Sequence, residues 1–160
     1  MSAVDLSQLN KLPYCSLIGC LLYFAISTCP DIAYAVQQLS QYLDSYSFEH
    51  WSTATQLVQY LKGTCDLKLY LGGDNPISLH AFSNSDWANC LDTCRSMGGY
   101  TCNLRSRALS WTAKKQKVVA ASSCEAEYVA AFETTKECIW IHALLNAIGY
   151  PVFPHDYSLQ

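Results

Sequence analysis

The spacing of apolar residues changes near residue 66, and this change constrains the fold more than any other feature of the sequence. Before it, Ala35, Leu39 and Tyr42 recur at helical spacing. After it, apolar residues alternate with other residues over 67–71, and the alternation resumes over 77–81. The sequence therefore predicts a helical first part and a second part that contains strands. The 160 residues suffice for one domain with a core and a helical appendage.

The first part predicts about three helices between residues 13 and 63. The apolar run 17–26 is too short to span a bilayer, which needs about 20 residues, so a buried helix is expected there. A second helix is expected to begin around Pro30, because proline is favoured in a first turn. A third is expected to begin at Ser47 and to end at Gly63.

The second part predicts further strands over 99–104 and 108–112, the latter continuing through 118–119. A long helix follows, with Ser122 and Glu125 as a capping box, and Gly149 ends it. Its expected apolar stripe consists of Tyr128, Ala131, Thr135, Ile139 and Ala143. The expected fold class is α+β: a helical connection segment, then an incomplete sheet with one long packed helix.

Positive charge is concentrated in one window of a chain whose formal net charge is −3. Between Asp92 and Glu125 there is no acidic residue. Six of the ten lysines and arginines form what we call the basic strip: Arg95, Arg105, Arg107, Lys114, Lys115 and Lys117. Such a strip favours contacts with the phosphates of a nucleic acid.

The nine cysteines do not follow a pattern typical of a disulfide framework or a zinc site. Their number is odd, there is no C-x-x-C pair, and residues 1–8 lack the features of a secretory signal. The histidines are scattered, at His50, His80, His142 and His155. We expect reduced thiols in an intracellular protein.

Acidic residues are the candidates for catalysis. Asp86 follows a predicted strand, while Glu125 and Glu127 lie in the first turn of the long helix. Carboxylates from different elements can hold two divalent cations for phosphodiester hydrolysis. The alternative is structural, because Asp at a strand end and Glu in a first turn are both common. A serine or cysteine hydrolase is disfavoured, since no G-x-S-x-G motif is present.

A series of short motifs carries a family resemblance along nearly the whole chain. In the first half the motifs are Y-C-S-L-I-G at 14–19, P-D-I-A-Y-A-V at 30–36, H-W at 50–51 and Y-L-K-G-T at 60–64. In the second half they are S-N-S-D-W-A at 83–88, S-W with K-K-Q at 110–116, and S-S-C-E-A-E-Y at 122–128. The series resembles copia-type retrotransposon Pol polyproteins, from the end of the reverse transcriptase into the ribonuclease H.

The resemblance implies two domains and an activity. Residues 1–65 would be a helical segment like the thumb or connection of a reverse transcriptase, and residues 66–160 a C-terminally truncated ribonuclease H-like domain. The family's activity is Mg²⁺-dependent hydrolysis of RNA in RNA–DNA hybrids. The polymerase aspartates of the family lie upstream, which excludes polymerisation by this chain alone. The implied location is intracellular, in a cytoplasmic virus-like particle or the nucleus.

The same resemblance places the catalytic and metal-binding residues. The helix glutamate falls on Glu127, but the first-strand acid falls on Asn84. An amide supplies no charged oxygen, so the affinity for Mg²⁺ should fall steeply. Asp86 lies two residues further along and, if the strand continues, on the same face, so it could substitute weakly. A later acid has no counterpart, and 157–160 is expected to be the beginning of the strand that would carry it.

Three hypotheses follow. The chain is a hybrid nuclease that uses Asp86 and Glu127, or a non-catalytic remnant that binds RNA–DNA hybrid or other nucleic acid through the basic strip. The third hypothesis is a protein-interaction fragment that pairs through an exposed sheet edge. We favour the second. The expected partners are nucleic acid, the remainder of the Pol polyprotein and, through the exposed edge, a second copy; a membrane is not expected.

Overall fold

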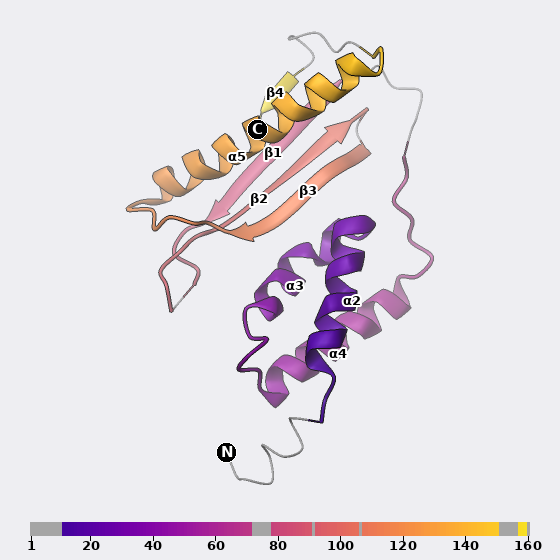
Figure 1. The fold of residues 1–160 in the computed structure, drawn as a ribbon, viewed down its shortest axis with the longest axis vertical. Helices are drawn as coiled ribbons and strands as arrows, with labels where there is room; N and C mark the ends of the chain where they lie inside the picture. Colours follow the sequence, from indigo (N-terminus) through magenta and orange to yellow (C-terminus); the bar gives the residue numbers. More distant parts are fainter. Residues whose placement is uncertain (1–10, 72–77, 91, 106, 151–156, 160) are drawn as a thin grey trace. The chain divides into compact units, whose positions relative to one another are not determined.

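The structure is a computed structural model, and Figure 1 shows its elements. It describes residues 11–71, 78–90, 92–105, 107–150 and 157–159. The chain divides into two compact units, Met1–Leu69 and Tyr70–Gln160. Helices form the first unit, whereas the second combines a sheet with one long helix. The predicted α+β class is confirmed.

The first unit contains the helices that the sequence predicts. They are α2 (Tyr14–Ser27), the 3₁₀ turn η1 (Pro30–Ile32), α3 (Ala33–Ser40) and α4 (Phe48–Gly63). Pro30 starts η1, which leads directly into α3. Ser47 caps α4: its Oγ accepts a hydrogen bond from the backbone N–H of His50, and its own N–H donates to His50 Nδ1 at 3.0 Å.

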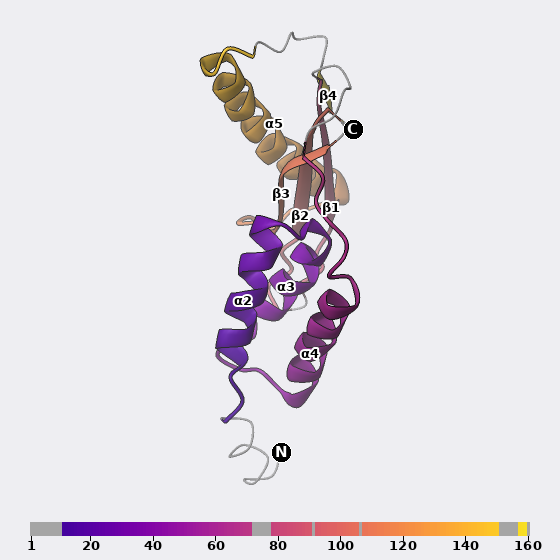
Figure 2. The same ribbon diagram turned by 90° about the vertical axis from the view of Figure 1, so that its right-hand side faces the viewer.

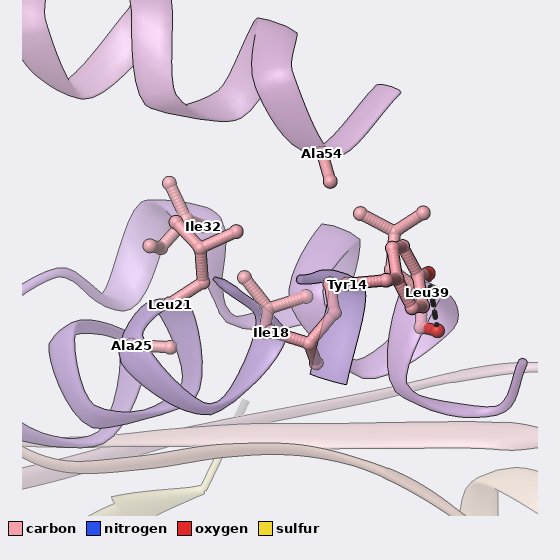
Figure 3. Packing of buried hydrophobic residues seen from close by; sticks show 8 residues of the cluster. Tyr14, Ile18, Leu21, Ala25, Ile32, Leu39 and Ala54 are labelled. Atoms are coloured by element: carbon pink, nitrogen blue, oxygen red, sulfur yellow. Dashed lines mark hydrogen bonds between the residues drawn. The ribbon is translucent and has the colours of Figure 1, made fainter. Parts of the chain in front are cut away.

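The core of the first unit forms where α2 meets η1, α3 and α4, as Figure 3 shows. Ile18 is fully buried, and the hydroxyl of Tyr14 donates to the backbone oxygen of Leu39 at 2.9 Å. Burial raises the pKa of Tyr14. Only one face of α2 is buried, however, because Tyr23 and Ile26 are 70% and 75% exposed. The helix expected over 17–26 is present, and the side that it buries carries Ile18, Leu21 and Ala25.

None of the helices in the described residues is long and apolar enough to cross a membrane. The longest, α5 (Ser123–Ala147), is interrupted by charged side chains such as Glu133 and Lys136.

The second unit is built on a four-stranded sheet of order β3-β2-β1-β4. The strands are β1 (Leu79–Asp86), β2 (Met97–Leu104), β3 (Arg107–Lys115) and β4 (Tyr157–Leu159). β1, β2 and β3 are antiparallel neighbours, whereas β4 runs parallel to β1. The strands expected over 99–104 and 108–112 are confirmed, as is the strand expected to begin at 157.

Two strand predictions were wrong. Residues 67–71 form no strand, and none of the described strands pairs with them. Leu67 and Leu71 are accordingly 73% and 68% exposed. β3 ends at Lys115 and does not continue through 118–119. Directly after β3, the side chain of Gln116 donates to Ser85 in β1 and to the backbone oxygen of Ala126 in α5.

The helix α5 packs against one face of the sheet, and Figure 2 shows it beside the strands. Ser122 caps it, accepting from the N–H of Glu125 at 3.2 Å, but the predicted capping box is incomplete, because the Glu125 carboxylate accepts from the N–H of Ala121 at 2.7 Å instead of that of Ser122. The predicted apolar stripe was wrong: Tyr128 is 74% exposed. The buried face consists of Ala126, Ala130, Thr134, Ile141 and Leu145. Its small residues allow the helix to approach the sheet closely.

Candidate functional site

The end of β1 meets the beginning of α5, which brings a predicted acid to the strand. The backbone N–H of Ser85 donates to Oε1 of Glu127 at 3.2 Å. Ser85 stands between Asn84 and Asp86, the two other residues of the predicted site. Glu127 therefore lies beside the strand that carries position 84.

Asn84 and Asp86 lie on one face of β1, because the strand continues through Asp86 and residues two apart share a face. Both are exposed. The side chain of Ser85 points to the other face, toward Gln116 and α5. The carboxylate of Asp86 accepts a hydrogen bond from the amide of Asn89. The carboxylates of Asp86 and Glu127 thus approach the same strand end from different sides.

These residues do not fit a pair of magnesium ions. Two divalent cations need several charged oxygen ligands, whereas this set offers two carboxylates and the neutral amide of Asn84. Within the described part of the chain, no three His, Cys, Asp or Glu side chains gather closely enough to hold a metal ion. The two predicted metal ligands, Asp86 and Glu127, approach the strand end from different sides, so each offers a single carboxylate to a weakly held cation.

Gln116 links the two elements of this site, although the sequence did not predict a functional role for it. Its Nε2 donates to Oγ of Ser85 at 3.1 Å and to the backbone oxygen of Ala126, next to Glu127, at 2.8 Å. The residue is 7% exposed, and Oε1 is buried without a protein partner. A Cβ on Gly98 would lie 3.3 Å from Nε2, so this glycine makes room for the amide.

The basic strip divides into two groups at opposite ends of β3. Arg107 begins the strand and Lys115 ends it. At about 3.3 Å per residue, their backbones lie roughly 26 Å apart. Arg105 belongs to the first end. Arg95 belongs to the second, together with Lys114 and Lys117, because Met97 pairs with Lys115.

Not every cation of the strip is equally available to a phosphate. Arg107 lies over the ring of Tyr70, 5.1 Å from its centre, and Lys115 donates to Sγ of Cys90 at 3.0 Å. Arg95, Lys114 and Lys117 are exposed. The pKa of Glu133 is lowered by its hydrogen bond to Lys136 and, to a smaller degree, by the charges of Lys114 and Lys117. The exposed group at the second end is therefore the better phosphate-binding candidate.

Cys90 has an unusually acidic thiol. Thr93 Oγ1 and Lys115 Nζ each donate to its sulfur at 3.0 Å. These hydrogen bonds, that of Thr93 first, lower the pKa of Cys90 to about 7. Near neutral pH a large fraction of Cys90 is thiolate, and its charge offsets that of Lys115.

Alkylation of Cys90 should therefore depend on pH with a midpoint near its pKa of about 7. The rate rises with pH because the thiolate is the nucleophile. Replacing Lys115 with methionine removes a donor and raises the midpoint; a rise of one pH unit slows the reaction at pH 7 roughly fivefold. Iodoacetamide labelling followed by peptide mass spectrometry measures both effects. Lys136→Met, which changes a lysine paired with Glu133, should leave the midpoint unchanged.

Comparison with known proteins identifies the family. The chain is 42% identical over 142 residues to the retrovirus-related Pol polyprotein from transposon TNT 1-94 of Nicotiana tabacum, covering 89% of this chain and 11% of the polyprotein. It is equally similar, 42% over 144 residues, to that from transposon RE2 of Arabidopsis thaliana, covering 88% and 10%. Secreted RxLR effector protein 161 of Plasmopara viticola is 35% identical over 83% of this chain and 94% of that protein.

The chain belongs to the family of copia-type retrotransposon Pol polyproteins, as the motifs predicted. It spans about a tenth of the length of the polyproteins that it matches. No family model matches the chain, and no solved structure matches it.

Proposed function

We propose that this chain binds RNA–DNA hybrids as a ribonuclease H-like segment of a Pol polyprotein and does not by itself cleave them. One observation carries the proposal: the helix carboxylate of Glu127 is held at the end of β1, where position 84 has an amide. The amide at position 84 lowers the negative charge available to a metal there, whereas exposed cations remain for contacts with phosphates.

Binding rests on the exposed cations at the second end of β3, Arg95, Lys114 and Lys117. Phosphate contacts by lysine and arginine supply affinity without sequence specificity, and they weaken as salt increases. Proteins recognise A-form helices mainly by shape and by backbone contacts. The exposed cations at the second end of β3 suit such a contact.

The lack of cleavage follows from the ligand set. Hydrolysis by two metals requires carboxylates that neutralise both cations and position the attacking water. Asn84 is neutral, and the carboxylate of Asp86 is already bound to Asn89. Two carboxylates on different sides of the strand end leave too little negative charge in one place.

The proposal is tested with a labelled RNA–DNA hybrid and the purified chain in the presence of Mg²⁺. We expect binding whose affinity falls as salt rises, and an intact RNA strand. Cleavage that Glu127→Ala abolishes would overturn the claim of inactivity. Binding that does not respond to salt would overturn the phosphate-contact claim.

Restoring the acid should restore part of the metal site. Asn84→Asp adds a carboxylate on the face of β1 that carries Asp86, and we expect Mg²⁺ to bind about tenfold more tightly, because affinity for hard cations follows the number of charged oxygen ligands. Isothermal titration calorimetry measures the change. Asn146→Asp, which adds the same charge near the C-terminal end of α5, is the matched control. If Asn84→Asp and Asn146→Asp raised the affinity for Mg²⁺ equally, position 84 would have no special role in binding the metal.

Self-association is a second candidate function. In the described part of the sheet β3 has a neighbour on one side only, so its other edge offers unpaired backbone groups. Large apolar side chains are exposed on α5 as well: Tyr128, Phe132, Ile139 and Trp140. Sedimentation velocity should therefore show a sedimentation coefficient that increases with concentration. A monomer at every concentration would contradict this candidate.

A further inference from the structure

Two thiols meet between the sheet and α5, outside the acidic site and the basic strip. Cys102 lies in β2 and is fully buried, and Cys138 lies in α5 and is half-buried. Their sulfurs are 3.9 Å apart. Cys102 belongs to a buried apolar cluster with Leu79 and Ile141, and Cys138 packs against that cluster. The two cysteines thus come from separate elements joined by 35 intervening residues.

We propose that Cys102 and Cys138 form a site of covalent modification that reacts with a low-molecular-weight disulfide and ends as an intramolecular disulfide. A disulfide bond is about 2.05 Å long, so the two sulfurs must approach by roughly 2 Å. Rotation about the side-chain torsions of cysteine moves a sulfur by this amount. The bond would join the central part of β2 to the middle of α5.

The reaction proceeds by two thiol–disulfide exchanges. Cys138 is the more exposed of the pair, so its thiolate attacks the small disulfide, forms a mixed disulfide and releases one small thiolate. The thiolate of Cys102 then attacks Sγ of Cys138 and releases the second small thiolate. The protons lost by the two cysteines end on the two released thiols. Two protein thiols are oxidised to one disulfide, and one small disulfide is reduced.

The surroundings make this reaction slow. Burial raises the pKa of Cys102 to about 12, and the nearby thiol of Cys138 and carboxylate of Glu137 contribute. Burial also raises the pKa of Cys138, again with a contribution from Glu137. Glu137 is held at this place by the hydroxyl of Ser110, which donates to it at 2.6 Å. Because the thiolate is the attacking species, the pair stays reduced during a brief exposure to oxidant and closes during a long one.

The test uses the full chain incubated with glutathione disulfide, then acid-quenched, alkylated and digested without reduction. We expect a peptide pair linked through Cys102 and Cys138, and a Tm higher by on the order of 10 °C that dithiothreitol reverses. Cys124→Ser, a change of an exposed cysteine of the same helix, should leave the link intact, whereas Cys138→Ser should abolish the link and the rise in Tm.

A second variant tests the chemistry of the pair. Glu137→Gln removes the negative charge and keeps an acceptor for Ser110, so the link should form faster at the same pH. A mixed glutathione disulfide that persists on Cys138, or a link between either residue and another cysteine, would overturn the proposal. Unlinked, unmodified thiols at the end of the incubation would overturn it as well.

Discussion

Replacing Arg95, Lys114 and Lys117 together with glutamine should remove most of the affinity for an RNA–DNA hybrid. The three cations are exposed at the second end of β3, and removing one phosphate-binding cation lowers the slope of log K against log salt by about 1. The slope of the triple variant should therefore be smaller by about 3, and its affinity at low salt should fall on the order of 100-fold. Fluorescence anisotropy titrations at several salt concentrations measure both quantities.

The matched control removes an equal number of positive charges from the first unit. Lys11, Lys62 and Lys68 are exposed residues of the first unit, and their replacement with glutamine removes the same number of charges. This control should keep most of the affinity and most of the salt slope. Equal losses of affinity in the two triple variants would mean that the net charge of the chain, rather than the basic strip, attracts the nucleic acid.

Gln116→Ala should destabilise the second unit by about 3 kcal/mol, since it leaves buried polar groups without a donor and opens a small cavity. The hydrogen bonds that it removes are those from Nε2 to Ser85 Oγ and to the backbone oxygen of Ala126. Urea unfolding followed by tryptophan fluorescence measures the free energy of unfolding. Gln59→Ala replaces an exposed glutamine of α4, and its effect should be close to zero.

The same variant should loosen the acidic site. Gln116 holds the residue that precedes Glu127, so its replacement frees the start of α5 from the end of β1. The N–H of Ser85, which donates to Glu127, should then exchange with solvent faster. An unchanged unfolding free energy together with unchanged exchange of the Ser85 amide would show that Gln116 does not link the two elements in solution.

Helix boundaries followed from local chemistry and were predicted from the sequence. Ser47 and Ser122 cap their helices with their own hydroxyl groups, so the signal lies within a few residues of each start. The apolar alternation over 67–71 predicted a strand that does not form, because a strand needs a hydrogen-bonding partner strand, which the local sequence does not specify. The buried face of α5 was missed for a similar reason. Apolar residues occur all around this helix, and only the packed sheet decides which of them are covered.

The candidate site was predictable only in part. The motif that contains Glu127 indicated the helix glutamate of the site, and in the structure the N–H of Ser85 in β1 donates to it. The role of Gln116 was missed because a glutamine after a strand carries no periodic or spacing signal, and its importance comes from three elements that meet in space. The separation of the basic strip into two ends also depends on the extended shape of β3, which a count of charges does not contain.

The length of β3 sets the minimum length of a duplex that can contact the whole basic strip. Its two charged ends lie roughly 26 Å apart, so a helix lying along the strand is touched at points several base pairs apart. A shorter duplex reaches only one end and meets either the two cations of the first end or the four of the second. We therefore expect only hybrids of nearly one helical turn or more to contact both ends of the basic strip, whatever their sequence.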